Sequence, residues 1–228
     1  MAAGIKTGSR QVSGKHRIYL VEDQPVTREG FAQLLNLQVD LEVCGQSANA
    51  GTALAEISEL EPDLVILDVA LAQSSGLELI KDLGIQAPSS PVLVFSACDE
   101  ALYAERCVRA GARGYIMKQA PLTEVMSAIR MVLRGETYLS EPMRSRVVRQ
   151  HLHGSPTAIS DLDSLSDREL EIFELIGRGH TTRHVATNLN LSISTVETHR
   201  AHIKEKLRLA NAVELVRRAV EWVNRPPP

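Results

Sequence analysis

The sequence predicts two domains: an α/β domain built on a doubly wound five-stranded parallel sheet, and a smaller all-α domain of four helices. Between Arg17 and Arg134, five short apolar runs alternate with longer amphipathic stretches, the pattern of a parallel sheet covered by helices on both faces. From Leu165 onward the periodic stretches have helical spacing. We therefore divide the chain into a disordered tail (1–15), an α/β domain (16–136), a linker (137–163) and a helical domain (164–228).

The five apolar runs have strand length, and each is followed by a stretch of helical length. Two of them, Leu64–Leu67 and Val92–Phe95, are apolar throughout and predict central strands buried on both sides. The predicted strands are RIYLVED, LEVCGQS, PDLVILD, PVLVFSA and ARGYIMK, and the predicted helices are PVTREGFAQLLNL, NAGTALAEISEL, GLELIKDLG, DEALYAERCVRAG and PLTEVMSAIRMVLRG.

Four helices are predicted after the linker, and capping signals mark two of their starts. Ser166–Glu169 has the S-x-x-E pattern of a capping box, and its helix is stopped by Gly177 and Gly179. Ser194–Glu197 has the same pattern and opens a longer helix that ends near Leu207. The other helices are predicted at Thr182–Leu189 and Ala212–Val223, and the linker favours a short helix over Arg144–Leu152.

Charge is distributed unevenly along the chain. The whole chain has a net charge of −3, which excludes a uniformly basic protein. Residues 16–139 hold 9 basic and 17 acidic side chains, a local charge of −8, whereas residues 180–208 hold 5 basic and 2 acidic side chains, a local charge of +3. This asymmetry predicts two domains with different partners.

The composition also indicates where the protein works. No apolar run approaches the ~20 residues of a membrane-spanning helix, and the first 15 residues lack the apolar centre of a signal peptide. Cys44, Cys98 and Cys107 are too few and too irregularly spaced for a disulfide framework or a zinc site. We therefore expect a protein of the reducing cytoplasm.

Acidic and polar side chains stand at the ends of the predicted strands, where sites form in doubly wound sheets. The first strand ends in Glu22 and Asp23, the third in Asp68, the fourth in Ser96 and the fifth in Lys118. Three carboxylates in one crevice repel each other unless a cation neutralises them, and an all-oxygen set suits Mg²⁺. With that metal, Asp68 can accept a phosphoryl group, while Lys118 and Ser96 hold phosphoryl oxygens. The alternative is that acidic strand ends only cap helices and face water.

The segment 17–134 resembles the receiver domain of bacterial two-component response regulators, which has a flavodoxin-like fold. Two positions depart from the pattern of that family: Ala72 stands where many receivers have Pro, and Gln119 stands where this branch often has Asp. Neither departure removes a charged group of the site. The matching positions, in order, are Glu22-Asp23, Asp68 followed by Gly76, Ser96-Ala97, Gly114-Tyr115 and Lys118.

The resemblance implies a role for each matching residue. Asp68 would be the phosphoacceptor, and Ser96 and Tyr115 would be the switch pair. When Ser96 moves toward a phosphoryl oxygen, it vacates space into which the Tyr115 ring can rotate. The alternative for Tyr115 is an ordinary packed position on a strand. The implied Mg²⁺ ligands are Glu22, Asp23, Asp68 and the backbone carbonyl of Ala70.

The helical domain resembles the LuxR-type helix-turn-helix of the NarL/FixJ branch of regulators. The residues that carry this resemblance are LSDRELEIFELIGRG, VATNLNLSISTVETHRAHIKEKL and NAVELV. On the third predicted helix, Val196, Ile203 and Leu207 share an inward face, which leaves Glu197, Thr198, Ala201, Lys204 and Arg208 outward.

The outward residues suit the major groove of DNA. Glu197 can accept from a cytosine amino group, Thr198 can touch a thymine methyl, and Ala201 offers van der Waals contact. The alternative for Glu197 is that it only closes the capping box with Ser194. The groups predicted to hold phosphates are Arg183, Arg200, Lys204, Lys206 and the helix amino terminus near Thr195.

The predicted helical domain also contains two histidine pairs and a stripe of valines at helical spacing. His180/His184 and His199/His202 have metal-ligand spacing, but without Cys or carboxylate partners we prefer solvated or phosphate-facing roles. The last helix carries Val213, Val216 and Val220 at helical spacing, and the resemblance implies that this helix dimerises on DNA. The alternative is that part of this stripe covers the helical bundle, and the sequence does not divide it between core and partner.

The sequence as a whole indicates a cytoplasmic DNA-binding response regulator. A sensor histidine kinase would phosphorylate Asp68 with Mg²⁺, and the protein would act as a homodimer when phosphorylated or DNA-bound. It would take part in its own phosphotransfer and dephosphorylation without being a turnover enzyme. One rival is a phosphohydrolase with an Asp nucleophile, but such enzymes usually place a second acid where Ala70 stands. The other rival is a regulator that works by protein contacts without phosphorylation.

Overall fold

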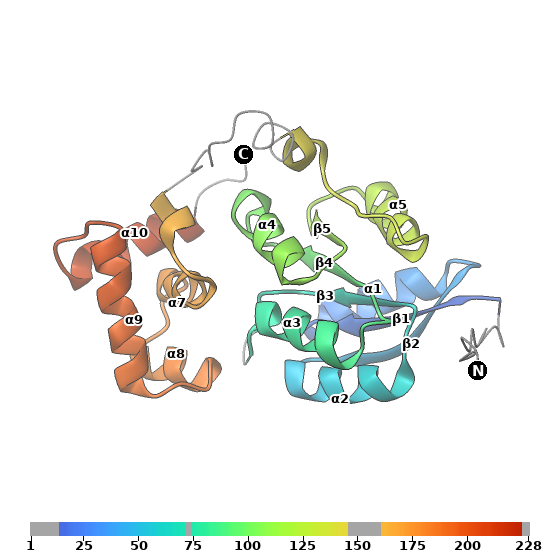
Figure 1. Cartoon of the computed structure of the whole chain (residues 1–228), viewed down its shortest axis with the longest axis horizontal. Coiled ribbons are helices and arrows are strands. Elements are labelled where there is room, and N and C mark those ends of the chain that lie inside the picture. The colour runs from blue at the N-terminus through green and yellow to red at the C-terminus, as the bar shows by residue number, and fades with distance from the viewer. Residues whose placement is uncertain (1–13, 72–73, 146–160, 225–228) are drawn as a thin grey trace, which may run out of the picture.

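The computed structural model describes residues 14–71, 74–145 and 161–224. It contains a five-stranded α/β domain and a helical domain that lies beside it (Figure 1). The five strands are all parallel and lie in the order β2-β1-β3-β4-β5, which confirms the predicted fold class. The elements of this domain are β1 (His16–Val21), α1 (Pro25–Asn36), β2 (Leu41–Ser47), α2 (Ala50–Leu60), β3 (Leu64–Leu67), α3 (Gly76–Gln86), β4 (Val92–Ser96), α4 (Glu100–Ala110), β5 (Gly114–Met117) and α5 (Leu122–Leu133).

The sheet is covered on both faces, as its continuous apolar strands require. Alternate strand residues such as Ile18 and Ile66 pack against α1 and α5, while Tyr19 and Val65 face α2, α3 and α4. All four residues of β3 are buried, as expected for a central strand. The strand order reverses between β1 and β3, so this fold has its topological switch point at their carboxyl ends.

The helical domain contains four α-helices in the described residues, preceded by a short 3-10 helix. Its elements are η1 (Asp161–Ser164), α7 (Asp167–Gly177), α8 (Thr182–Asn188), α9 (Ile193–Lys206) and α10 (Ala212–Val223). The inward residues predicted for α9, Val196, Ile203 and Leu207, are all buried. No helix in the described part of the chain is long and apolar enough to cross a membrane.

One predicted capping box is confirmed and the other is wrong. The Ser166 side chain accepts from the Glu169 amide and the Glu169 carboxylate accepts from the Ser166 amide, which starts α7. In α9 the cap is Ser192, whose hydroxyl accepts from the Thr195 amide, so Ser194 already lies inside the helix. Extended backbone at Ser192 places the helix start two residues earlier than the prediction.

Several sequence predictions fall on residues that the structure does not describe. Most of the predicted tail (1–15) lies outside the described residues, as does Ala72. Residues 141–145 are helical, and the remainder of the predicted Arg144–Leu152 helix is outside the described part. Tyr138, at the start of the predicted linker, forms an isolated bridge with Gly114 and buries its ring beside the sheet.

Close packing of α7 on α10 predicts a steric requirement at Gly177. A Cβ added there would lie 2.4 Å from the Ala219 carbonyl oxygen, so Gly177→Ala must push the two helices apart. We expect a loss of about 1–3 kcal/mol in the unfolding free energy of the helical domain, measured by denaturant titration. Gly84→Ala, within α3 of the α/β domain, is the steric control, because a Cβ at Gly84 meets nothing within 4 Å; an equal loss in the unfolding free energy of that domain would contradict the steric explanation.

Candidate functional site

The predicted carboxylate cluster forms at the switch point of the sheet. Glu22 and Asp23 follow β1, Asp68 follows β3, and Lys118 follows β5, so all of them reach the carboxyl edge. Lys118 Nζ lies 2.5 Å from Glu22 Oε2 and 2.7 Å from Asp68 Oδ2, and Ser96 Oγ donates to Asp68 Oδ1 at 2.6 Å. The structure therefore brings together residues that are up to 96 positions apart.

The three carboxylates are placed as a metal site requires. Glu22, Asp23 and Asp68 each offer one oxygen within 4.8 Å of the others. An all-oxygen donor set at the mouth of a sheet fits Mg²⁺, which takes carboxylates together with waters and phosphate oxygens. Ala70 lies beside this set, because its amide donates to Asp68 Oδ1 at 3.0 Å.

Burial and neighbouring charges shift the pKa values of Glu22 and Lys118 in opposite directions. Burial raises the pKa of Glu22, and the hydrogen bond from Lys118 offsets only part of that effect. Burial lowers the pKa of Lys118, but Asp68 and Glu22 outweigh it, so the net pKa is raised and the ammonium stays charged. The pocket thus holds one permanent cation among three carboxylates, and a divalent cation would balance the remaining charge.

The two residues of the predicted switch pair both point inward. The Tyr115 ring is fully buried, and its hydroxyl donates to the Cys98 carbonyl oxygen at 2.7 Å. The Cys98 amide donates in turn to Ser96 Oγ at 3.3 Å. Ser96 and Tyr115 are therefore linked through the backbone of Cys98, a residue to which the sequence analysis gave no role.

The sequence analysis also missed a contact between the domains. The face of α7 that carries Glu171 and Glu174 rests on α3 and α4, next to the carboxyl edge of the sheet (Figure 1). Tyr103 donates to Glu174 Oε2 at 2.5 Å, the Cys98 thiol lies 3.5 Å from Glu174 Oε1, and Ser75 donates to Glu171.

Ion pairs surround this contact at the start of α7. Asp167 binds Lys81 and Arg106, each at 3.1 Å, and Arg168 pairs with Glu78 at 3.1 Å. Three of the four acidic residues of α7 recur at positions 167, 171 and 174, so these three share one helix face. That spacing is the only signal in the sequence that could have indicated this contact, and it does not say which basic surface complements it.

The helix-turn-helix surface is open in this arrangement of the domains. Glu197, Thr198 and Ala201 are all exposed on α9, and Arg183 of α8 is exposed as well. Glu197 Oε1 accepts from Thr182 Oγ1 at 2.9 Å, so it links α9 to α8 instead of closing a capping box with Ser194. Among the residues predicted to contact DNA, Thr195 and Lys204 are partly exposed at the same surface.

Two predicted phosphate contacts are already engaged within the domain. Lys206 is 38% exposed, but its ammonium group lies 2.6 Å from Glu169 Oε2 and so pairs with α7. Arg200 is largely covered and lies 3.6 Å from Glu197 Oε2.

The valine stripe of α10 lies on the surface of the domain, and other residues of this helix form its buried face. Leu215 and Ala219 are fully buried, whereas Val213 is 76% exposed, Val216 is 41% exposed and Val220 is 37% exposed. The three residues predicted to dimerise therefore form an apolar strip on the outside of the domain.

An acidic pocket at the switch point of a five-stranded parallel sheet, joined to a helix-turn-helix domain, defines a DNA-binding response regulator. Residues 18–130 match the family model of the response regulator receiver domain, and residues 163–219 match that of the bacterial regulatory proteins, luxR family. The chain belongs to the NarL/FixJ-type response regulators.

Known relatives and solved structures agree with this family. The chain is 35% identical to the oxygen regulatory protein NreC of Staphylococcus haemolyticus over 210 residues, which cover 90% of this chain and 97% of that protein. RcsB from Salmonella enterica serovar Typhimurium, bound to promoter rprA with the phosphomimetic BeF3⁻, shares its fold with a TM-score of 0.67 at 20% identity, over 90% of this chain and 98% of RcsB. A LuxR-family two-component response regulator from Aurantimonas sp. SI85-9A1 matches with a TM-score of 0.57 at 27% identity, over 61% of this chain and 99% of that one.

The ion pairs of Asp167 predict an acid-sensitive contact. Burial alone would raise the pKa of Asp167, but Lys81 and Arg106 outweigh it and lower the pKa below the ordinary value. A carboxyl group whose native pKa is lowered stabilises the folded state above its unfolded pKa of about 3.9, and this stabilisation is lost as the pH falls through the native pKa. Asp167→Asn should therefore cost less than about 1 kcal/mol near pH 7 and progressively less as the pH falls below about 3.9, measured by calorimetric unfolding.

The control for this titration is Asp82→Asn, which removes an exposed carboxylate of α3. A difference between Asp167→Asn and the wild-type chain that stays constant across the acid range would contradict the role of the ion pairs.

Proposed function

We propose that this chain is a cytoplasmic transcription regulator of a two-component phosphorelay, in which phosphorylation of Asp68 is coupled to dimerisation and promoter binding. The observation that carries the proposal is the placement of Asp68 between Ser96 and Lys118, beside Glu22 and Asp23. A sensor histidine kinase would be the phosphoryl donor. The same chain would assist its own dephosphorylation without being a turnover enzyme.

The pocket residues divide the phosphoryl transfer between them. A carboxylate oxygen of Asp68 attacks the phosphorus atom, and the bond from phosphorus to the donor breaks as the new P–O bond forms. Lys118, now 2.7 Å from Asp68 Oδ2, would then hold a phosphoryl oxygen, and Ser96 Oγ would donate to another. Mg²⁺ on Glu22, Asp23, Asp68 and the Ala70 carbonyl would supply the positive charge that lets two anionic groups meet.

The coupling would run through Cys98. Ser96 donates to Asp68 and accepts from the Cys98 amide, and the Cys98 thiol contacts Glu174 of α7. A phosphoryl group that draws Ser96 away would remove one support of this segment and let the Tyr115 ring repack against α4. We infer that the contact of α7 with the receiver domain then loosens, which frees the helical domains to pair.

DNA recognition would use the exposed surface of α9. Glu197, Thr198 and Ala201 would face base edges, while Arg183, Lys204 and the helix start near Thr195 would hold phosphates. Arg200 and Lys206 would have to leave Glu197 and Glu169 before they reach a phosphate. The apolar strip of Val213, Val216 and Val220 would pair two helical domains on adjacent half-sites.

Phosphorylation is tested with a small-molecule donor. Acetyl phosphate with Mg²⁺ should add one acid-labile phosphoryl group to the chain, and mass spectrometry should find no uptake in Asp68→Asn. Asp82→Asn, which changes an exposed carboxylate, should be phosphorylated normally. Phosphorylated protein should also sediment increasingly as a dimer.

Other outcomes of that experiment would support different functions. Steady release of phosphate with turnover would indicate a phosphohydrolase. Undiminished uptake by Asp68→Asn would remove Asp68 as the acceptor, and DNA binding that is unaffected by this substitution would indicate a regulator that works without phosphorylation.

The phosphate contact of Lys204 is tested by salt dependence. Each phosphate contact contributes about −0.9 to the slope of log K against log salt concentration, so Lys204→Ala should flatten that slope by roughly one unit. The measurement is a fluorescence anisotropy titration on promoter DNA at several salt concentrations. Arg113→Ala removes an exposed cation from the receiver domain and should leave the slope unchanged. An unchanged slope for Lys204→Ala would place this residue outside the DNA interface.

A further inference from the structure

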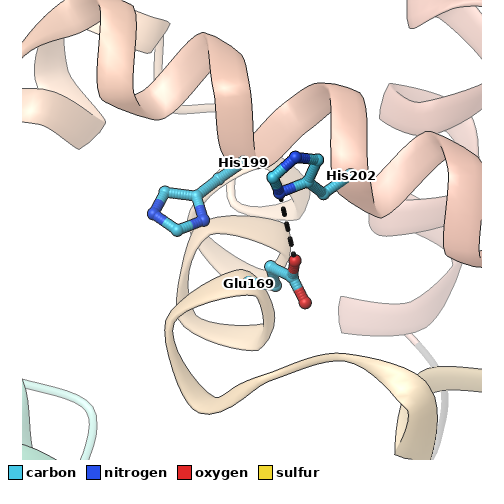
Figure 2. Close-up of side chains that lie close together, drawn as sticks. All are labelled: Glu169, His199 and His202. Atoms are coloured by element: carbon cyan, nitrogen blue, oxygen red, sulfur yellow. Dashed lines mark ion pairs between the residues drawn. The ribbon is translucent and has the colours of Figure 1, made fainter.

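Three metal-ligating side chains meet between α7 and α9, away from the acidic pocket. Glu169 comes from the first turn of α7, and His199 and His202 come from one face of α9 (Figure 2). Each offers one ligand atom within 4.8 Å of the other two. The sequence analysis set a metal aside at this pair because no carboxylate partner was evident, and the fold supplies that carboxylate from 30 residues upstream.

The carboxylate of Glu169 has one oxygen in use and one turned toward the histidines. Oε2 accepts from the Ser166 amide at 2.7 Å and from Lys206 Nζ at 2.6 Å. Oε1 lies 3.8 Å from His202 Nδ1, which is too far for a hydrogen bond but close enough for both atoms to bind one ion (Figure 2). The Glu169 side chain is only 5% exposed, so its position is fixed by packing.

His199 supplies an independent sign that a ligand belongs here. Its Nδ1 atom is buried and has no hydrogen-bond partner among the described residues. Buried polar atoms nearly always have a hydrogen-bond partner or a bound ion. A buried nitrogen without one, in a cluster of metal-ligating side chains, therefore indicates that a ligand binds there.

We propose that Glu169, His199 and His202 bind a divalent transition metal of the Zn²⁺ class, which bridges α7 and α9. Two imidazoles and one carboxylate form a common nitrogen and oxygen set for Zn²⁺, with water in the remaining position. Bonds of about 2.0–2.1 Å in tetrahedral geometry bring ligand atoms to about 3.3 Å from each other. His202 is 53% exposed and can make the necessary rotation without disturbing the core.

The other histidine pair shows why the third ligand matters. His180 Nδ1 and His184 Nδ1 lie 3.2 Å apart, yet no acidic or cysteine side chain completes a cluster there in the described part of the chain. This pair is therefore a natural control within the same domain.

The proposed site borders the predicted base-reading surface. His202 is 53% exposed and follows Thr198 by four residues on α9, so the two side chains share a helix face, whereas Glu169 approaches from α7. A bound ion would fasten the recognition helix to α7 at the edge of that surface. This inference does not depend on phosphorylation of Asp68.

The test measures metal uptake by the full-length chain. Protein stripped with a chelator is dialysed against micromolar Zn²⁺ in excess Mg²⁺, and bound zinc is counted by mass spectrometry. His202→Ala and His199→Ala should each bind one equivalent less than the wild-type chain, and a His180→Ala/His184→Ala double variant should bind the same amount as wild type. Zinc should raise the melting temperature of the helical domain in the wild-type chain and the double variant, but not in the two single variants.

A second measurement identifies the ligands directly. Nitrogen-detected NMR of the imidazole rings should show Zn²⁺-induced shifts at His199 and His202, with circular dichroism confirming that the variants are folded. Lys206→Met should increase the affinity, because the ammonium group competes for the same carboxylate. Equal zinc uptake in wild type and both single variants, loss of uptake only in the His180/His184 variant, or no uptake by the wild-type chain would each overturn the proposal.

Discussion

The receiver pocket depends on the ammonium group of Lys118. This single cation contacts Glu22, which follows β1, and Asp68, which follows β3. It therefore bridges the ends of the two strands at the topological switch point of the sheet. Without it, the neighbouring buried carboxylates would repel each other with no side-chain cation between them. Parallel pairing of the strands brings Glu22, Asp68 and the hydroxyl of Ser96 to one edge of the sheet, and Lys118 bridges the two carboxylates there.

Helix α7 connects that pocket to the DNA-binding surface. One face carries Glu171 and Glu174 onto the receiver domain, and its first turn carries Glu169 toward α9. A change at Asp68 therefore has a short route to α7, through Ser96 and Cys98, both of which are uncharged and buried. Because α7 also packs closely on α10 at Gly177, a shift of α7 would carry the rest of the helical domain with it.

Local patterns in the sequence were sufficient to predict the fold class and to predict which residues meet in the acidic pocket. Parallel strands end at one edge, so residues such as Asp68 and Lys118 could be placed together without any structure. The contact of Tyr103 with Glu174 and the approach of Glu169 to the histidines depend on how distant helices pack, which spacing does not encode. The cap at Ser192 was missed because Ser194 offers the same local pattern, and only the backbone conformation distinguishes the two.

The open surface of α9 has a consequence for a cell that holds many copies of the protein. The docked receiver domain does not cover Thr198 and Ala201, so a single helical domain would still present these residues to DNA. Occupancy by unpaired copies then follows mass action and rises with protein concentration. Abundance would set a basal level of promoter occupancy, and the signal would multiply that level through pairing instead of switching it from zero.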